Sequence, residues 1–111
     1  MWTLETLTDA TDETGSADPV RRPPFRIVPG SIRTIGRATG ADFIIDAALV
    51  SRVHCRLTSL PDGGLEVLDL ESTNGTFVNG RRVDSARLAH GDRLKVGRVE
   101  LLVVRDGATT H

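Results

Sequence analysis

Short runs in which apolar and polar residues alternate make up most of the chain. In Cys55-Arg56-Leu57-Thr58, for example, every second residue is apolar, which is the period of a strand with one buried face. Turn-forming residues such as Pro61–Gly64 separate these runs, and no segment has the period of an amphipathic helix. The pattern predicts strands over residues 2–8, 25–28, 32–35, 43–45, 53–58, 65–70, 76–78, 93–96 and 99–104.

Many short strands joined by tight turns are typical of an antiparallel β-sandwich or barrel, in which each strand gives alternate side chains to the core. On this interpretation Cys55, Leu57, Leu65 and Val67 face the core, and the residues between them face solvent. A chain of 111 residues has the usual length of one domain, so we expect a single all-β domain over residues 1–111.

Two segments fall outside the strand pattern. Residues 9–24 are acidic and then rich in proline, with too few apolar residues to pack, so we expect a long mobile loop between the first two strands. Residues 105–111 are expected to form a short tail.

The charges are unevenly distributed. The chain has 15 acidic and 14 basic residues, but residues 1–18 hold five acidic residues and no basic one, which leaves a surplus of four positive charges elsewhere. All the basic residues except Lys95 are arginine, which suits phosphate or carboxylate ligands, although a compositional bias of the source genome explains this equally well. So small a surplus, with only 4% aromatic residues, argues against a nucleic-acid partner.

Membrane-bound and secreted classes are also disfavoured. The apolar runs are far shorter than the about 20 residues that span a bilayer, and the first residues lack the charged-then-apolar pattern of a signal peptide, so we expect none. The single cysteine, Cys55, excludes an internal disulfide framework and favours a reducing compartment. We therefore expect a cytoplasmic protein with no membrane partner.

Catalysis is the first possible use of the polar residues. Ser51, His54 and Asp69 are the residue types of a catalytic triad, but a spacing of three within one strand would place Ser51 and His54 on opposite faces. The Gly-x-Ser-x-Gly turn of many serine hydrolases is absent, and His54, Cys55, His90 and His111 lack zinc-ligand spacing. We therefore expect no enzyme activity, no metal and no cofactor.

Ligand binding suits the polar residues better, because they gather at the ends of predicted strands. Gly36-Arg37 closes one strand, Ser51-Arg52 opens another, and Ser72–Thr76 adds hydroxyl and amide groups at a turn. Arginines and hydroxyls without a general base suit a bound phosphate rather than a reaction.

The order of these motifs resembles that of the forkhead-associated (FHA) domain. The similarity runs from about residue 25 to residue 104, and residues 2–8 resemble the first strand of the family. The motifs that carry it are Thr34–Arg37, Asp42–Ile45, Ser51–His54, Asp69–Gly80 and Leu88–Gly97. The resemblance implies an eleven-stranded antiparallel β-sandwich of the FHA/SMAD-like type, with the ligand loops at one end.

The resemblance also implies a function and a set of site residues. FHA domains bind phosphothreonine peptides without catalysis, so we expect an interaction module in Ser/Thr-kinase signalling. The implied phosphate contacts are Arg37, Ser51, Arg52 and Thr73, the peptide-backbone contact is Asn74, and the supporting residues are Gly36, His54 and Gly75. Arg52 stands at a position that varies within the family.

The expected partners are phosphothreonine-containing proteins, bound by a monomeric domain. One candidate ligand lies within the chain, because a kinase could phosphorylate one of the threonines that stand among acidic residues near the N-terminus, and the phosphothreonine would then be a ligand for the chain's own pocket. These threonines are Thr6, Thr8, Thr11 and Thr14. The alternative function is a phosphate-independent scaffold that binds a partner through a sheet face. A large exposed apolar patch on one sheet would favour that alternative.

Overall fold

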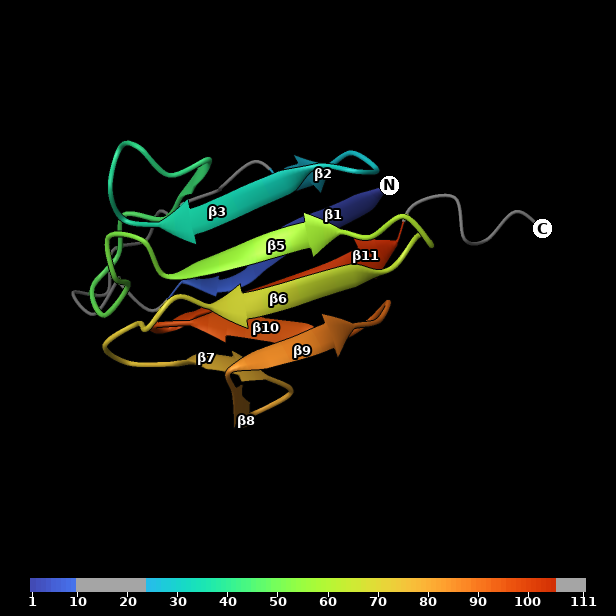
Figure 1. The fold of residues 1–111 in the computed structure, drawn as a ribbon. Coiled ribbons are helices and arrows are strands. Elements are labelled where there is room, and N and C mark those ends of the chain that lie inside the picture. The colour runs from blue at the N-terminus through green and yellow to red at the C-terminus, as the bar shows by residue number, and fades with distance from the viewer. Residues whose placement is uncertain (10–23, 106–111) are drawn as a thin grey trace.

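The computed structural model describes residues 1–9 and 24–105, which form eleven strands (Figure 1). The strands are β1 (Trp2–Asp9), β2 (Phe25–Ile27), β3 (Ile32–Gly36), β4 (Phe43–Ile44), β5 (Cys55–Ser59), β6 (Leu65–Asp69), β7 (Thr76–Val78), β8 (Arg81–Val83), β9 (Ser85–Leu88), β10 (Arg93–Val96) and β11 (Val99–Arg105). Apart from their first or last residues, the predicted loop over 9–24 and tail over 105–111 lie outside the described residues.

Two sheets pack face to face. Six strands form one sheet in the order β2-β1-β11-β10-β7-β8, and five form the other in the order β4-β3-β5-β6-β9. This arrangement confirms the expected all-β sandwich. One pairing departs from the antiparallel pattern, because the short β4 runs parallel to β3, with Ile35 opposite Phe43 and Gly36 opposite Ile44. The described residues include no helix long and apolar enough to cross a membrane.

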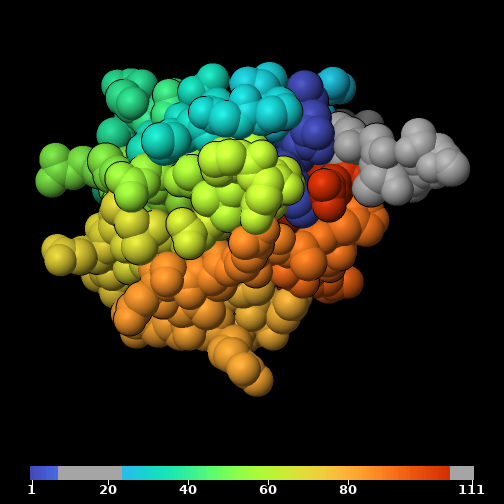
Figure 2. Space-filling model, turned by 45° about the vertical axis from the view of Figure 1, so that its right-hand side comes forward, coloured from blue at the N-terminus to red at the C-terminus, as the bar shows by residue number. Residues whose placement is uncertain are grey.

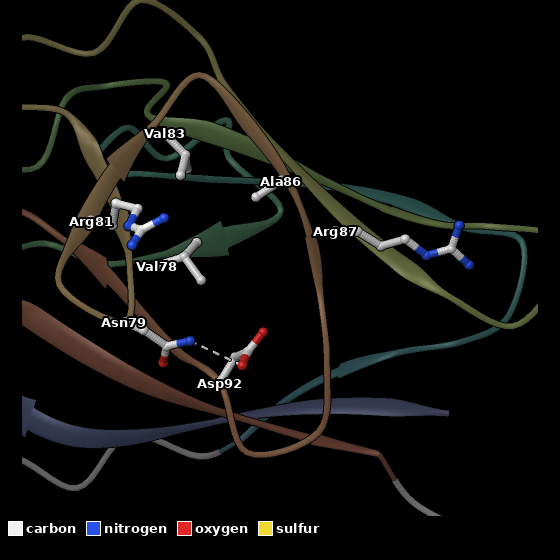
Figure 3. A pocket seen from close by; sticks show the side chains of 7 residues that line it. All are labelled: Val78, Asn79, Arg81, Val83, Ala86, Arg87 and Asp92. Atoms are coloured by element: carbon white, nitrogen blue, oxygen red, sulfur yellow. Dashed lines mark hydrogen bonds between the residues drawn. The ribbon is translucent and has the colours of Figure 1, made fainter.

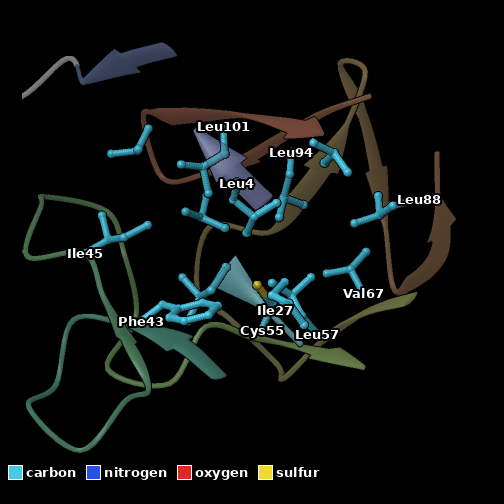
Figure 4. Close-up of a cluster of buried hydrophobic side chains, with 14 of the residues drawn as sticks. Leu4, Ile27, Phe43, Ile45, Cys55, Leu57, Val67, Leu88, Leu94 and Leu101 are labelled. Atoms are coloured by element: carbon cyan, nitrogen blue, oxygen red, sulfur yellow. The ribbon is translucent and has the colours of Figure 1, made fainter. Parts of the chain in front are cut away.

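The core lies between the sheets and draws side chains from both (Figure 4). Leu57 and Val67 from one sheet face Leu94 and Leu101 from the other, and all four are fully buried. Cys55 and Leu65 are buried as well, so the predicted inward positions of these two strands are confirmed. Alternate residues of β5 and β6 can reach the core because successive side chains of a strand point to opposite faces.

Some strand boundaries differ from the predicted ones. Val53 and His54 precede β5 instead of opening it, because the Arg52 and Val53 backbone crosses close over Gly36 before the strand begins. The alternation pattern also missed β8 and β9, although the family resemblance implied eleven strands. Both are short edge strands: β8 has one apolar residue, Val83, and the alternation of Ala86 and Leu88 with polar residues in β9 covers only four positions, which is too short a run to stand out.

The outer face of the five-stranded sheet is seen obliquely in Figure 2. Its exposed residues are of mixed character. Ile32 and Ile44 are exposed there, but Arg56, Glu66 and Arg87 on the neighbouring strands are exposed too. This face therefore does not form the large apolar patch that would favour the scaffold alternative.

Candidate functional site

The loops that follow β3, β4 and β6 lie at the same end of the sandwich (Figure 1). Between them is an open pocket of about 330 Å³. Its lining residues are Arg37, Ala48, Leu49, Val50, Ser51, Thr73 and Asn74. The structure therefore brings together four of the five residues predicted to touch the ligand, although they come from three separate loops. Arg52, the fifth, is exposed and is not among the lining residues.

Gly36 sets the position of Arg37 at the end of β3. A Cβ atom on Gly36 would lie 2.0 Å from the carbonyl oxygen of Arg52, so only glycine lets the two backbones come this close. The Arg37 N–H then donates to the Ser51 carbonyl at 2.9 Å, and Arg37 Nε donates to the Val50 carbonyl at 3.1 Å. These two bonds anchor the guanidinium group at the pocket wall and leave its terminal nitrogens available to an anion.

His54 links the loop before β5 to the loop before β7. Its Nδ1 atom accepts a hydrogen bond from the Ser51 N–H at 3.1 Å, and its Nε2 atom lies 2.8 Å from the carbonyl oxygen of Gly75. A carbonyl oxygen can only accept, so the proton of the neutral imidazole must sit on Nε2. Burial lowers the pKa of His54, despite the opposing effects of the Gly75 carbonyl and the Asp69 charge.

The Ser51 hydroxyl bonds the loop over residues 70–75 and not the imidazole of His54. Its oxygen accepts a hydrogen bond from the Thr73 N–H at 3.0 Å, which leaves the hydroxyl proton free to be donated. His54 Nδ1 is already occupied by a backbone N–H. Ser51 and His54 therefore do not form the hydroxyl–imidazole contact of a catalytic triad. From the sequence we reached the same conclusion by assuming that both residues lie on one strand and point to opposite faces. In the structure neither residue belongs to a strand.

Asp69, at the end of β6, holds the loop over residues 70–75 in shape. Its Oδ1 atom accepts hydrogen bonds from the Ser72 hydroxyl at 2.5 Å and the Thr76 hydroxyl at 2.7 Å, and Oδ2 accepts one from the Ser72 N–H. The Ser72 hydroxyl in turn accepts the Gly75 N–H at 2.9 Å. Burial opposes the charge of Asp69, but these hydrogen bonds outweigh it and lower the pKa of the carboxyl group.

Asn74 and Leu49 both line the pocket and are joined by a hydrogen bond. Asn74 Nδ2 donates to the Leu49 carbonyl at 3.1 Å, so the amide oxygen stays free for another donor. Leu49 has a φ of 72° and is 44% exposed as a residue, an unusual combination for a large apolar residue. The motifs pointed to Asn74, whereas nothing in the alternation pattern marked Leu49 or its neighbours Ala48 and Val50 as pocket residues.

The chemistry of the lining suits an anion. Within the described residues, one guanidinium group and two hydroxyl groups face the pocket and no carboxylate lines it. Within residues 1–9 and 24–105, no three His, Cys, Asp or Glu side chains come together as metal ligands would. The arrangement can therefore bind a charged oxyanion and hold it with hydrogen bonds from several directions.

Comparisons with known proteins agree with this geometry. The family model for the FHA domain matches residues 33–97. The chain is 49% identical over 79 residues to the ABC transporter ATP-binding/permease protein Rv1747 of Mycobacterium tuberculosis. The aligned stretch covers 71% of this chain and 9% of that protein. It is 42% identical over 67 residues to the glycogen accumulation regulator GarA of Mycolicibacterium smegmatis, which covers 60% of this chain and 42% of that one.

The fold comparison gives the same result over a longer stretch. A solved structure from a structural and functional analysis of phosphothreonine-dependent FHA domain interactions superimposes with a TM-score of 0.74 and 30% identity. The superposition covers 94% of this chain and 95% of that one. The chain thus spans less than half the length of the two relatives named above but nearly all of a solved FHA domain. It belongs to the FHA domain family.

Proposed function

We propose that this chain is a non-catalytic module that binds phosphothreonine peptides in Ser/Thr-kinase signalling. FHA domains are among the folds that recognise phosphorylated motifs through arginine side chains. The observation that carries the proposal is the pocket at the loop end, which is lined by Arg37, Ser51 and Thr73 and, among the residues that the structure describes, by no carboxylate.

The phosphate group supplies the features that this pocket requires. It carries a charge of about −1.5 to −2 at neutral pH and has three acceptor oxygens. The terminal nitrogens of Arg37 and the hydroxyl protons of Ser51 and Thr73 are the donors for these oxygens. In this proposal Asn74 bonds the backbone of the bound peptide through its amide oxygen, which the hydrogen bond to Leu49 leaves unused. An unphosphorylated threonine offers none of these acceptors.

Arg52 has a less direct role in the proposal. Its carbonyl oxygen packs over Gly36, while its side chain is exposed beside the pocket and not in its lining. It supplies a second positive charge near the phosphate if the side chain turns toward the bound peptide. We therefore expect a smaller loss of affinity on replacing Arg52 than on replacing Arg37.

The site geometry also supports a role without catalysis. A general base needs an accessible proton acceptor near the nucleophile. Both ring nitrogens of His54 are occupied by backbone groups, and Asp69 is occupied by Ser72 and Thr76. These two residues shape the pocket, and neither is available to activate Ser51 or a water molecule.

The partners in this proposal are proteins that carry a phosphothreonine, and the domain acts as a monomer. Its own Thr11 and Thr14, which lie outside the described residues, are included as possible ligands after phosphorylation. Intramolecular binding would compete with an external phosphopeptide. If a chain phosphorylated at these threonines bound external phosphopeptide as tightly as the unmodified chain, this part of the proposal would be wrong.

Calorimetric titration tests the function directly. The ligands are degenerate peptides with a central phosphothreonine, phosphoserine or unmodified threonine. We expect binding of the phosphothreonine peptides, weaker binding of the phosphoserine peptides, which lack one methyl group, and none of the unmodified ones. Equal or absent binding of all three would contradict the proposal.

The variant Arg37→Ala identifies the pocket that is used. A hydrogen bond to a charged group contributes roughly 1.5 to 3 kcal/mol, so the variant should bind phosphothreonine peptide about 10- to 100-fold more weakly or worse. Arg56→Ala is the matched control, because Arg56 is an exposed arginine on the outer face of β5. Unchanged affinity of Arg37→Ala, or an equal loss in Arg56→Ala, would show that the phosphate binds elsewhere.

A further inference from the structure

A second pocket, of about 400 Å³, lies at the side of the sandwich where β8 and β9 are the outermost strands of the two sheets (Figure 3). We call this side the open flank. The residues that line it are Val78, Asn79, Arg81, Val83, Ala86, Arg87 and Asp92. It shares no lining residue with the pocket at the loop end. The two pockets therefore differ in position and in composition.

The second pocket exists because the sandwich is not closed on this side. β8 is the last strand of the six-stranded sheet and β9 is the last strand of the five-stranded sheet. Val78, Val83 and Ala86 are only partly buried, and all three pack against the hydrophobic core. Their side chains form an apolar floor that solvent can reach, which is unfavourable in the absence of a partner.

Arg81 is the one cation of this pocket that has no partner within the described residues. Figure 3 shows its side chain beside Val78, whereas Arg87 points away from the apolar floor. Arg87 pairs with Asp62 at 2.6 Å. The carboxylate of Asp92 accepts hydrogen bonds from Asn79 Nδ2 and from the Ala89 N–H, so it is not available to neutralise Arg81. An anionic group on a partner would find an unpaired guanidinium here.

The edge of β9 adds backbone groups to this site. β9 pairs with β6 on one side, with Ala86 opposite Val67, and has no strand on the other side among the described residues. An edge strand of this kind can accept an additional strand through its free N–H and C=O groups. A strand beside β9 would direct alternate side chains onto the same face as Ala86, and therefore into the pocket.

We propose that this open flank is a docking site for an extended, unphosphorylated segment of a partner protein. The segment lies beside β9, inserts an aliphatic side chain over Val78, Val83 and Ala86, and places an Asp or Glu two residues away on Arg81. The spacing follows from the strand period, because residues two apart share one face. This interaction is independent of phosphothreonine binding and would let the domain hold two segments at once.

Selection from a phage-displayed library of short random peptides, which carry no phosphate, tests the proposal. We expect enrichment of sequences with an aliphatic residue and an acidic residue two positions apart. A selected peptide should shift the amide resonances of Val78, Val83 and Ala86 in NMR titrations. It should bind Arg81→Glu roughly tenfold more weakly or worse, because the attraction between Arg81 and the acidic residue of the peptide becomes a repulsion between two carboxylates.

Arg56→Glu is the control, since it makes the same charge change on an exposed arginine of the outer sheet face. Phosphothreonine peptide should bind Arg81→Glu as tightly as the wild type, which separates this test from that of the loop-end pocket. Enriched peptides without the expected motif, resonance shifts confined to the loop-end pocket, or equal effects of the two variants would each overturn the proposal.

Discussion

Gly36 and Leu49 both have unusual backbone environments. At Gly36 the environment permits only glycine, whereas at Leu49 a residue with a side chain adopts a conformation that usually suits glycine. Gly36 is required by sterics, because the Arg52 carbonyl occupies the space where a Cβ atom would be. Leu49 adopts a left-handed conformation, which costs a residue with a Cβ atom roughly 1–2 kcal/mol. That conformation is accompanied by a hydrogen bond from Asn74 to the Leu49 carbonyl. The Gly-Arg dipeptide is visible in the sequence, whereas the role of Leu49 depends on a residue 25 positions away.

Replacement of Gly36 tests how strictly the site depends on this close approach. The added methyl group of Gly36→Ala would collide with backbone atoms that cannot rotate away, so the loop that carries Ser51 and Arg52 must move. We expect a loss of about 1–3 kcal/mol in the free energy of unfolding, measured by urea denaturation, together with weaker phosphopeptide binding.

Gly40→Ala provides a matched control for Gly36→Ala. A Cβ atom at Gly40 would have no heavy atom within 4 Å, so this variant should keep wild-type stability or exceed it slightly. Equal stability of Gly36→Ala and Gly40→Ala would mean that the backbone approach at Gly36 is not a constraint.

The loops of the site depend on one another through side-chain links. His54 joins the Ser51 backbone to Gly75, and Asp69 with Ser72 shapes the turn in between. The sequence motifs marked His54 as a supporting residue only through the family resemblance. The hydrogen bonds that give it this position come from residues three places before it and 21 places after it.

The link through His54 predicts a dependence of stability on pH. Burial lowers the pKa of His54 in the folded state, so below the unfolded value of about 6.5 the unfolded chain binds more protons. The contribution of neutral His54 to stability is therefore complete above this pH and is lost as the pH falls toward the folded pKa. Urea denaturation between pH 8 and pH 5 should show this decline in the wild type and a smaller one in His54→Gln.

His90→Gln serves as the control for this measurement, because His90 is an exposed histidine in the turn between β9 and β10. NMR of the imidazole nitrogens should also show the proton of His54 on Nε2, as its two partners require. A decline of the same size in His54→Gln and wild type would contradict the assignment of the pH effect to His54.

The strands differ in how far their own sequence specifies them. β5 and β6 carry a clear alternation of buried and exposed residues, and both were predicted within a few residues. β8 and β9 carry a weaker signal, because β8 has a single apolar residue, Val83, and the alternation in β9 covers only four residues. The parallel pairing of β4 was also unpredicted, since two residues carry too little pattern to indicate a direction.

The reactivity of the Cys55 thiol reports on whether the whole sandwich is folded. Burial, the largest cause, raises the pKa of its thiol to about 12, and the thiol lies in the core between the two sheets. The thiolate is the reactive form, so we expect native protein at pH 8 to react with a disulfide reagent only when the chain unfolds. Leu57→Ala, which should destabilise the core by about 2–5 kcal/mol, should speed the reaction about 30-fold or more.

This experiment distinguishes global from local opening. If reaction at Cys55 were fast while circular dichroism showed a folded protein, β5 would open on its own and the core would not act as one unit. An unchanged rate in Leu57→Ala would lead to the same conclusion. A matched rise in reaction rate and loss of stability would instead support cooperative unfolding of the sandwich.

The sequence by itself determined nine of the eleven strand-forming segments, the turns that separate them and the residues of β5 and β6 that face the core. These features follow from side-chain period and turn chemistry, which act over a few neighbouring residues. Its motif order also identified the residues that gather at the loop end. Only the tertiary structure decided that Leu49 and Val50 line the pocket, that Arg52 does not, and that β8 and β9 leave one flank open. These features depend on contacts between residues far apart in the chain, which no local pattern encodes.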